Sequence, residues 1–185
     1  GGTIAKFANA GHRVTVCEVT RGINEEALKI IRNEAYEAHN VLGVYETLFL
    51  DLPGLDLHLT PTRQKNTPYL DVVKKVKPEI VFIPHHGDLH SDHSSCADSC
   101  MVALRPMNVP QLRAIYAYET LSESEWNVPD GAHAFIPNTW SDITKTLEKK
   151  LEAMKCYKSQ LRLFPHPRSI EAIEALAKVR GSTVC

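Results

Sequence analysis

Short apolar runs alternate with longer amphipathic stretches along almost the whole chain, and this alternation limits the fold more than any other feature. The apolar runs read as strands at residues 13–19, 45–52, 79–84 and 112–120. Helix patterns lie before, between and after them, at residues 4–8, 24–40, 67–78, 94–104, 141–161 and 169–179. Strands that alternate with helices are typical of α/β domains. The sequence therefore predicts an α/β fold whose mainly parallel sheet carries helices on both faces.

The composition is that of an ordinary globular domain. The chain has 185 residues, 43% of them hydrophobic, and a net charge of −1. This balance gives no reason to expect a nucleic-acid partner, and no apolar run approaches the ~18 residues of a membrane helix. We also expect no secretory signal. The cysteines are odd in number and unpatterned (Cys17, Cys96, Cys100, Cys156 and Cys185), so we expect reduced thiols and a cytoplasmic location.

A histidine-rich segment, IPHHGDLHSDH at residues 83–93, directly follows the strand at 79–84. Ligands of open α/β sheets bind beyond the carboxyl ends of the strands. His90 and His93 are three residues apart, so one helical turn would point both the same way, with Asp92 between them. Imidazole is a standard zinc ligand, and a carboxylate can be a ligand, an orienting group or a base. The segment predicts a metal or acid–base site; the alternative is a polar loop whose histidines cap a helix.

The sequence H-S-D-H at residues 90–93, after P-H-x-x-D, resembles the second motif of the PIG-L/LmbE-like N-acetylglucosaminyl deacetylases. These are zinc hydrolases that remove the acetyl group from the 2-amine of a sugar. Further stretches are similar to the family in the same order, at residues 1–16, 30–44, 116–126, 135–161 and 164–182. The resemblance implies a Rossmann-like α/β domain, a Zn²⁺ cofactor and an N-acetylated amino sugar or its conjugate as substrate.

Matched residue by residue, the resemblance implies a role for each member of the motif. His93 matches the zinc ligand. His90 matches the histidine beside the tetrahedral intermediate, where it donates to the oxyanion or protonates the leaving amine. Asp92 is then the residue that orients His90 or stabilises its charged form. Zinc itself would lower the pKa of a bound water and polarise the amide carbonyl.

One departure from the family is large. The first family motif, A-H-P-D-D-E, supplies two zinc ligands and the general base, and it is absent from this chain. It is expected immediately before Gly1, and the chain also stops soon after R-G-S. We therefore expect residues 1–185 to be a single PIG-L/LmbE-like domain truncated at both ends, inactive by itself. A second departure concerns the R-x-x-E helix motif of the family, in which the glutamate follows the arginine by three residues. In this chain Glu34 lies two residues after Arg32.

Two residues outside the histidine segment have alternative interpretations. The resemblance implies that Arg32 contacts the sugar, whereas its position beside the apolar stripe equally suits a surface ion pair. His166, in F-P-H-P-R-S, either reaches the pocket, in its own chain or in a neighbouring subunit of a homo-oligomer, or only forms a rigid turn between prolines.

For the remaining candidate residues, a structural role is the preferred interpretation over a catalytic one. Cys96 and Cys100 form an H-x-x-C-x-x-x-C pattern with His93, which suits either a second type of zinc hydrolase site or buried thiols along a helix. We expect His85 and His86 to shape the loop, although one of them could touch substrate. The alternative function for the whole chain is a non-catalytic carbohydrate-binding or interaction module with the deacetylase fold and no metal.

Overall fold

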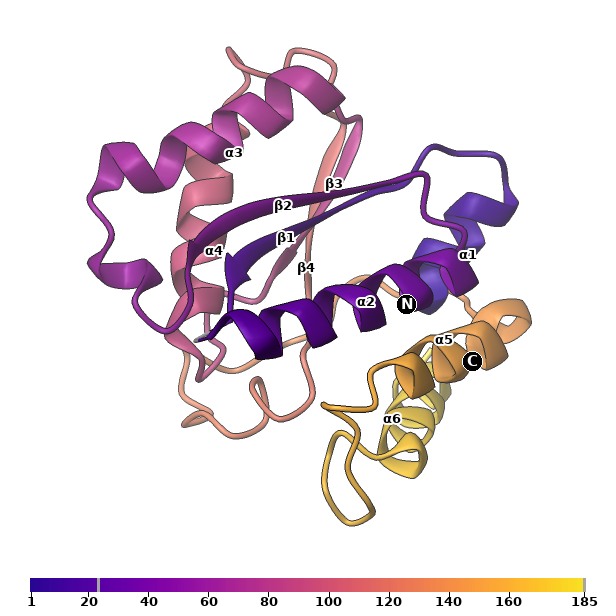
Figure 1. The fold of residues 1–185 in the computed structure, drawn as a ribbon. Helices are drawn as coiled ribbons and strands as arrows, with labels where there is room; N and C mark the ends of the chain where they lie inside the picture. The colour runs from indigo at the N-terminus through magenta and orange to yellow at the C-terminus, as the bar shows by residue number, and fades with distance from the viewer. Residues whose placement is uncertain (23, 185) are drawn as a thin grey trace. The chain divides into compact units, whose positions relative to one another are not determined.

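The computed structural model describes residues 1–22 and 24–184, so the fifth cysteine, Cys185, lies outside the described residues. Helices and strands alternate along the chain (Figure 1), which confirms the predicted α/β class. The elements are α1 (Gly2–Asn9), β1 (Thr15–Arg21), α2 (Glu25–Leu42), β2 (Glu46–Pro53), η1 (Leu57–Leu59), α3 (Thr62–Val76), β3 (Ile80–Pro84), α4 (Ser91–Ala103), β4 (Ala114–Tyr118), η2 (Thr144–Thr146), α5 (Leu147–Cys156) and α6 (Ile170–Ser182).

The described strands form two pairs, β1 with β2 and β3 with β4. The second pair is parallel, with Ile80 opposite Ala114 and Pro84 opposite Tyr118. Contacts within the chain define two compact units. The first unit comprises residues 1–18, 22–49 and 137–185, and the second comprises residues 19–21 and 50–136. The expectation of a single domain stays a prediction.

The core of the first unit is built from small residues on α1, α2 and α5. Ala5, Ala38 and Ala153 are buried there together with Leu42. Because alanine side chains are short, the three helix backbones can approach closely. The ends of α2 follow the sequence signals: Asn24 Oδ1 accepts from the amide of Ala27 at 2.8 Å, and Gly43 ends the helix with φ +75°.

Two helices differ from the sequence pattern. The predicted helix at 141–161 is regular only over α5 (Leu147–Cys156), after the short 3₁₀ turn η2. Beyond α5, the amide of Ser159 donates to the buried Glu34 carboxylate at 2.8 Å instead of to a helix carbonyl. In contrast, α3 begins at Thr62, before the predicted start, and continues through Pro68. Tyr69 and Val73 on this helix are buried in the core, and this packing outweighs the one hydrogen bond that proline cannot make.

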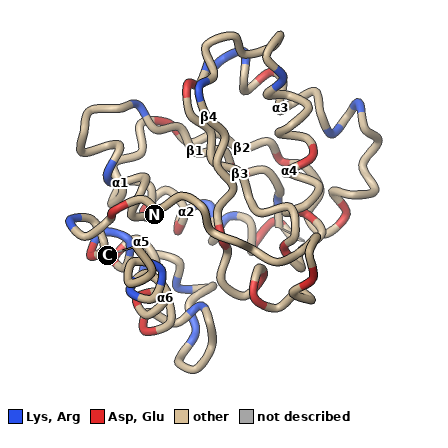
Figure 2. Tube along the Cα trace, turned by 180° about the vertical axis from the view of Figure 1, so that it is seen from behind, with Lys and Arg blue, Asp and Glu red and all other residues tan. Residues whose placement is uncertain are grey.

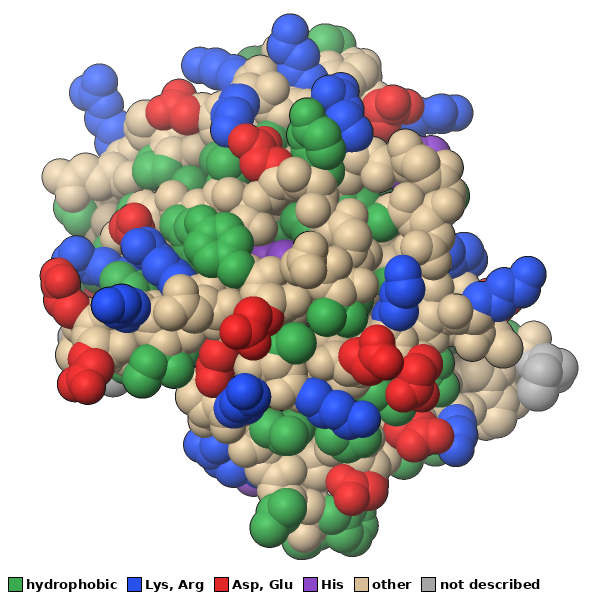
Figure 3. Space-filling model, turned by 45° about the vertical axis from the view of Figure 1, so that its right-hand side comes forward, with side chains coloured by type: hydrophobic (Ala, Val, Ile, Leu, Met, Phe, Trp, Pro, Cys, Tyr) green, Lys and Arg blue, Asp and Glu red, His purple; other side chains and the backbone are tan. Residues whose placement is uncertain are grey.

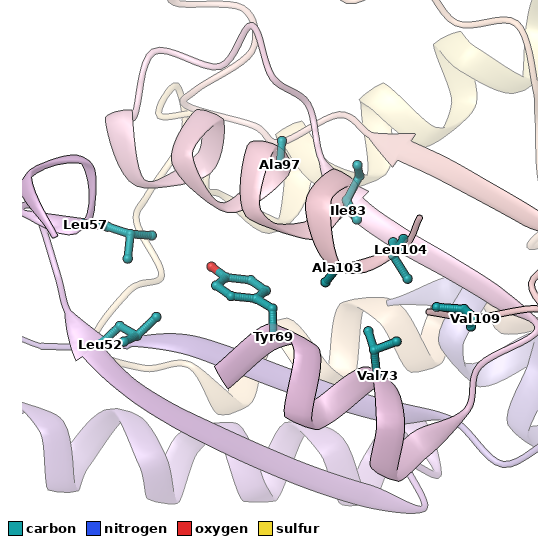
Figure 4. Close-up of a cluster of buried hydrophobic side chains, with 9 residues drawn as sticks. All are labelled: Leu52, Leu57, Tyr69, Val73, Ile83, Ala97, Ala103, Leu104 and Val109. Carbon is teal, nitrogen blue, oxygen red and sulfur yellow. The ribbon is translucent and has the colours of Figure 1, made fainter. Parts of the chain in front are cut away.

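The core of the second unit gathers apolar side chains from α3, α4, the 3₁₀ turn η1, strands β2 and β3 and the loops between them (Figure 4). Its buried members are Leu52, Leu57, Tyr69, Val73, Ile83, Ala97, Ala103, Leu104 and Val109. Three of them, Ala97, Ala103 and Leu104, lie on or directly after α4. Packing of this face fixes α4 against β3 and thereby holds the first turn of α4 where the chain leaves β3.

The surface mixes both signs of charge. Lysine and arginine occur interspersed with aspartate and glutamate along the trace (Figure 2), and hydrophobic side chains lie among the charged ones on the face drawn in Figure 3. None of the helices in the described part of the chain combines the length and apolar character that crossing a membrane requires.

Candidate active site

The histidine segment lies entirely in the second unit, between β3 and the first turn of α4. Helix α4 begins at Ser91, three residues before the predicted start at Ser94, so Asp92 and His93 lie in its first turn. His90 is the N-cap, and its Nδ1 accepts from the backbone amide of Asp92 at 3.2 Å. Since Nδ1 accepts, a neutral His90 carries its proton on Nε2. This ring therefore presents an N–H donor on its outer edge.

His93 has the opposite arrangement. Its Nδ1 lies 2.8 Å from Oδ2 of Asp88, whose carboxylate is fully buried. A carboxylate only accepts, so Nδ1 of His93 donates, and Nε2 of the neutral ring keeps a free lone pair. Burial by itself lowers the pKa of His93, but the hydrogen bond and charge of Asp88, helped by Glu123, outweigh it and raise the pKa above its usual value.

The two rings lie side by side. Their centroids are 5.2 Å apart and their planes differ by 19°. One imidazole therefore offers a hydrogen-bond donor and its stacked neighbour offers a lone pair. A metal ligand and a donor to a developing oxyanion require this combination of groups.

Asp92 contacts His90 through its backbone amide, which donates to Nδ1 of the ring. The predicted role of Asp92, to orient His90 or to stabilise its charged form, stays a prediction. The buried carboxylate of Asp92 accepts from the amide of Leu55 through Oδ2, at 2.8 Å. Leu55 has a φ of +66°, a conformation that is costly for leucine, so the hydrogen bond also supports this turn. Oδ1 of Asp92 is buried and has no hydrogen-bond partner among the described residues.

A second segment, residues 120–133, holds the loop before α4. The amide of Leu89 donates to the carbonyl of Glu123 at 3.1 Å, and Nδ2 of Asn127 donates to the carbonyl of Gly87 at 2.9 Å. Nε2 of His85 donates to the carbonyl of His133 at 2.9 Å. These contacts fix the path of the loop and assign His85 a loop-shaping role.

Gly87 is required by one close approach in this arrangement. A Cβ at this position would lie 2.5 Å from the carbonyl oxygen of His133 and 2.5 Å from Nε2 of His85. Any other residue would push the two segments apart. His86 is different: its Nε2 lies 3.3 Å from Asp98 Oδ1, and both side chains are largely exposed.

The two cysteines of α4 lie together, with their Sγ atoms 4.0 Å apart. Hydrogen bonds from Cys100 and Tyr69 lower the pKa of the Cys96 thiol and outweigh the effect of burial. Within residues 1–22 and 24–184, the structure brings together no group of three or more His, Cys, Asp or Glu side chains that could hold a metal. The alternative set of His93, Cys96 and Cys100 is therefore not assembled.

Arg32 and His166 belong to the first unit. The guanidinium carbon of Arg32 lies 4.6 Å from the centroid of the Phe49 ring. Arg32 and Phe49 line an open cavity of about 410 Å³, together with Glu25, Leu28, Lys29, Asn33 and Tyr36. His166 lies in the turn before α6, where its Nδ1 accepts from the amide of Arg168 at 3.0 Å. A role for either residue in substrate binding stays a prediction.

The sequence interpretation missed Asp88 and Ser124. The hydroxyl of Ser124 donates to Oδ1 of Asp88, whose other oxygen accepts from His93. Asp88 was visible only as part of the P-H-x-x-D lead, and nothing marked Ser124. Glu34, the departure from the R-x-x-E pattern, is buried and accepts from the amide and hydroxyl of Ser159.

Comparisons with known proteins agree on the fold. The PIG-L family, described as GlcNAc-PI de-N-acetylase, matches residues 1–104. Diacetylchitobiose deacetylase of Thermococcus kodakarensis is 26% identical over an alignment of 175 residues, and the match covers 86% of this chain. The chain spans 64% of the length of that relative.

Three solved structures share the architecture, each with 22% sequence identity. The conserved protein TT1542 from Thermus thermophilus has a TM-score of 0.77 over 99% of this chain and 81% of its own. The N,N'-diacetylchitobiose deacetylase of Pyrococcus horikoshii, solved with its inhibitor MPG, has a TM-score of 0.73 over 99% and 73%. The 4-carboxy-2-hydroxymuconate hydratase GalB of Pseudomonas putida KT2440 has a TM-score of 0.75 over 98% and 79%.

Proposed function

Because this chain belongs to the PIG-L family, we propose that the whole protein is a zinc-dependent hydrolase that removes the N-acetyl group from an N-acetylated amino sugar or its conjugate. The observation that carries the proposal is the stacked pair of imidazoles, His90 and His93, whose Nδ1 atoms have opposite partners: a backbone amide at His90 and a carboxylate at His93. Fold similarity cannot replace this observation, because one neighbour of the same architecture is named a hydratase.

The residues of this chain fit a metal ion in two respects. His93 donates Nδ1–H to a carboxylate, as metal-ligating histidines almost always do, and this leaves Nε2 as the ligand atom. Oδ1 of Asp92 is a buried carboxylate oxygen without a partner among the described residues, and a cation would satisfy it. We therefore propose that His93 holds zinc. Bound zinc would supply Lewis acidity, which lowers the pKa of water and polarises a carbonyl.

His90 supplies the electrophilic assistance in this proposal. Its Nε2–H donates to the amide oxygen as negative charge develops there, or passes its proton to the leaving amine. Asp92 keeps the ring in this state through the backbone bond to Nδ1. In the neutral ring, Nε2 is a donor only while Nδ1 accepts, so the helix cap and the proposed chemistry depend on the same tautomer.

Arg32 is proposed to bind sugar hydroxyls. The cavity beside it combines hydrogen-bonding side chains with the aromatic faces of Tyr36 and Phe49, a combination that suits a carbohydrate. His166 is proposed as a further sugar contact, within one chain or across a homo-oligomer. A cytoplasmic location is proposed from the unpatterned cysteines.

The decisive experiment offers the whole protein N-acetylglucosamine and N,N'-diacetylchitobiose, and measures acetate release and zinc content together. Acetate release that disappears with chelation and returns with zinc is the expected result. Sugar binding measured by calorimetry, with neither acetate release nor stoichiometric zinc, would instead support the non-catalytic carbohydrate-binding module.

A further inference from the structure

We propose that Asp88 and Ser124 are positioning residues that determine which nitrogen of His93 carries the proton. The inference rests on the proposed metal role of His93 but concerns two residues outside the H-S-D-H motif. Oδ2 of Asp88 accepts from Nδ1 of His93 at 2.8 Å, and Oδ1 accepts from the hydroxyl of Ser124. Both oxygens of a fully buried carboxylate are therefore occupied by donors from different segments.

The donor direction is consistent along this whole chain of hydrogen bonds. The amide of Thr120 donates to Oγ of Ser124 at 2.9 Å, so the hydroxyl hydrogen is left to point at Asp88. Asp88 then accepts at both oxygens, which prevents its carboxylate plane from rotating away from His93. Aligned bonds of this kind polarise and strengthen one another in a buried site.

The alternative tautomer of His93 is disfavoured by the same contact. If the proton moved to Nε2, the lone pair on Nδ1 would face a buried carboxylate at hydrogen-bond distance. That arrangement loses a charge-assisted hydrogen bond and places two electron-rich atoms together in a low-dielectric site. Asp88 therefore keeps the Nε2 lone pair available in advance of any ligand.

Ser124 lies in a turn whose backbone is also bonded to the histidine loop. It is buried, and the neighbouring Glu123 carbonyl accepts from Leu89, on the loop that carries Asp88. The turn at 120–124 is thus attached to the loop twice, once through backbone and once through the serine hydroxyl. We infer that loss of the hydroxyl loosens Asp88 without removing its hydrogen bond to His93.

The test compares zinc affinity by chelator competition in the whole protein. Asp88→Asn should weaken zinc binding by roughly 10- to 100-fold, as loss of an outer partner of a ligating histidine typically does. Asp98→Asn is the matched control, since Asp98, on α4, forms an exposed pair with His86 of the preceding loop, and the zinc affinity of this variant should not change. Ser124→Ala should weaken binding less than Asp88→Asn. Ser94→Ala removes a hydroxyl that bonds the Ser91 carbonyl and should not weaken binding.

A second readout follows the proton directly. In metal-free protein at alkaline pH, ¹⁵N NMR should show His93 with its proton on Nδ1, and Asp88→Ala should shift a substantial part of the population to the Nε2–H form. If Asp88→Ala does not fold, Asp88→Asn carries the test because the amide has the same size. The proposal is overturned by an Nε2–H tautomer in the unmodified protein, or by equal zinc affinities of Asp88→Asn and Asp98→Asn.

This pair of readouts separates the inference from the proposed function. A protein that releases acetate without zinc would refute the metal role of His93, while the NMR result would still report on Asp88. Conversely, if the enzyme is zinc-dependent but the His93 tautomer does not change in Asp88→Ala, the proposed function stands and the positioning role of Asp88 is refuted.

Discussion

The backbone amide of Asp92 donates to Nδ1 of His90 at 3.2 Å, so that one hydrogen bond caps α4 and also leaves the His90 proton on Nε2. The structural and the proposed catalytic roles of this histidine can be separated, because they use different nitrogens. Other residue types can cap a helix, but few of them can also present an N–H donor on the far side of the side chain.

His90→Asn and His90→Ala should therefore differ in stability and agree in activity. Asparagine can still accept from the first turn, whereas alanine should cost about 0.5–2 kcal/mol of unfolding free energy through the lost cap. Both variants should lose roughly 10²–10³ in kcat in the whole protein, since neither provides the Nε2–H donor. Denaturant titration and acetate release measure the two effects. Full activity of His90→Asn would remove His90 from the chemistry.

His93→Ala should lose bound zinc, in contrast to both His90 variants, which should keep it. The reason is that only His93 presents a lone pair, because its Nδ1–H is bonded to Asp88. Elemental analysis of the three purified variants checks this difference. Equal zinc content in all three would show that His93 is not a ligand.

Gly87→Ala should displace the histidine loop. The new methyl group would lie 2.5 Å from the His133 carbonyl oxygen, and overpacking of this kind typically costs about 1–3 kcal/mol. We expect a lower Tm and a lower kcat in the whole protein. Gly131→Ala is the matched control, since a Cβ there meets nothing within 4 Å. A Tm equal to that of the control would mean that the loop adjusts without strain.

Glu34→Gln should destabilise the first unit without a direct effect on the histidine loop. The buried carboxylate accepts from the amide and the hydroxyl of Ser159, at 2.8 and 2.6 Å. Hydrogen bonds to a charged group contribute about 1.5–3 kcal/mol, and the amide of glutamine can replace only part of this. Thermal unfolding should show the loss, while Glu37→Gln, on the exposed side of the same helix, should unfold like the unmodified protein.

Arg32→Ala should raise KM more than it lowers kcat in the whole protein. A contact to a sugar hydroxyl away from the reacting amide acts equally on the ground state and the transition state. Steady-state kinetics with N,N'-diacetylchitobiose measures this split, and Arg105→Ala, an exposed arginine of the second unit, serves as the control. Kinetics identical to the control would assign Arg32 to packing against Phe49 alone.

Local signals in the sequence determined the order of elements, the caps of α2 and the position of the histidine segment. Asn24, Gly43 and Ser169 act through residues only a few positions away, so their roles are encoded in short patterns. The spacing of His90 and His93 acted in the same way: three residues within one helical turn brought the two rings together.

The tertiary structure decided how each of these groups is used. Asp88 meets Ser124 across 36 positions of chain, and Asp92 meets Leu55 across 37, so no local pattern could pair them. The end of α5 likewise depends on Glu34 of α2, which is far away in the sequence and accepts a hydrogen bond from the amide of Ser159. The sequence alone shows which residues are of a type that can accept a proton or hold a metal. Which of their atoms is left free depends on donors that only folding brings within hydrogen-bond distance.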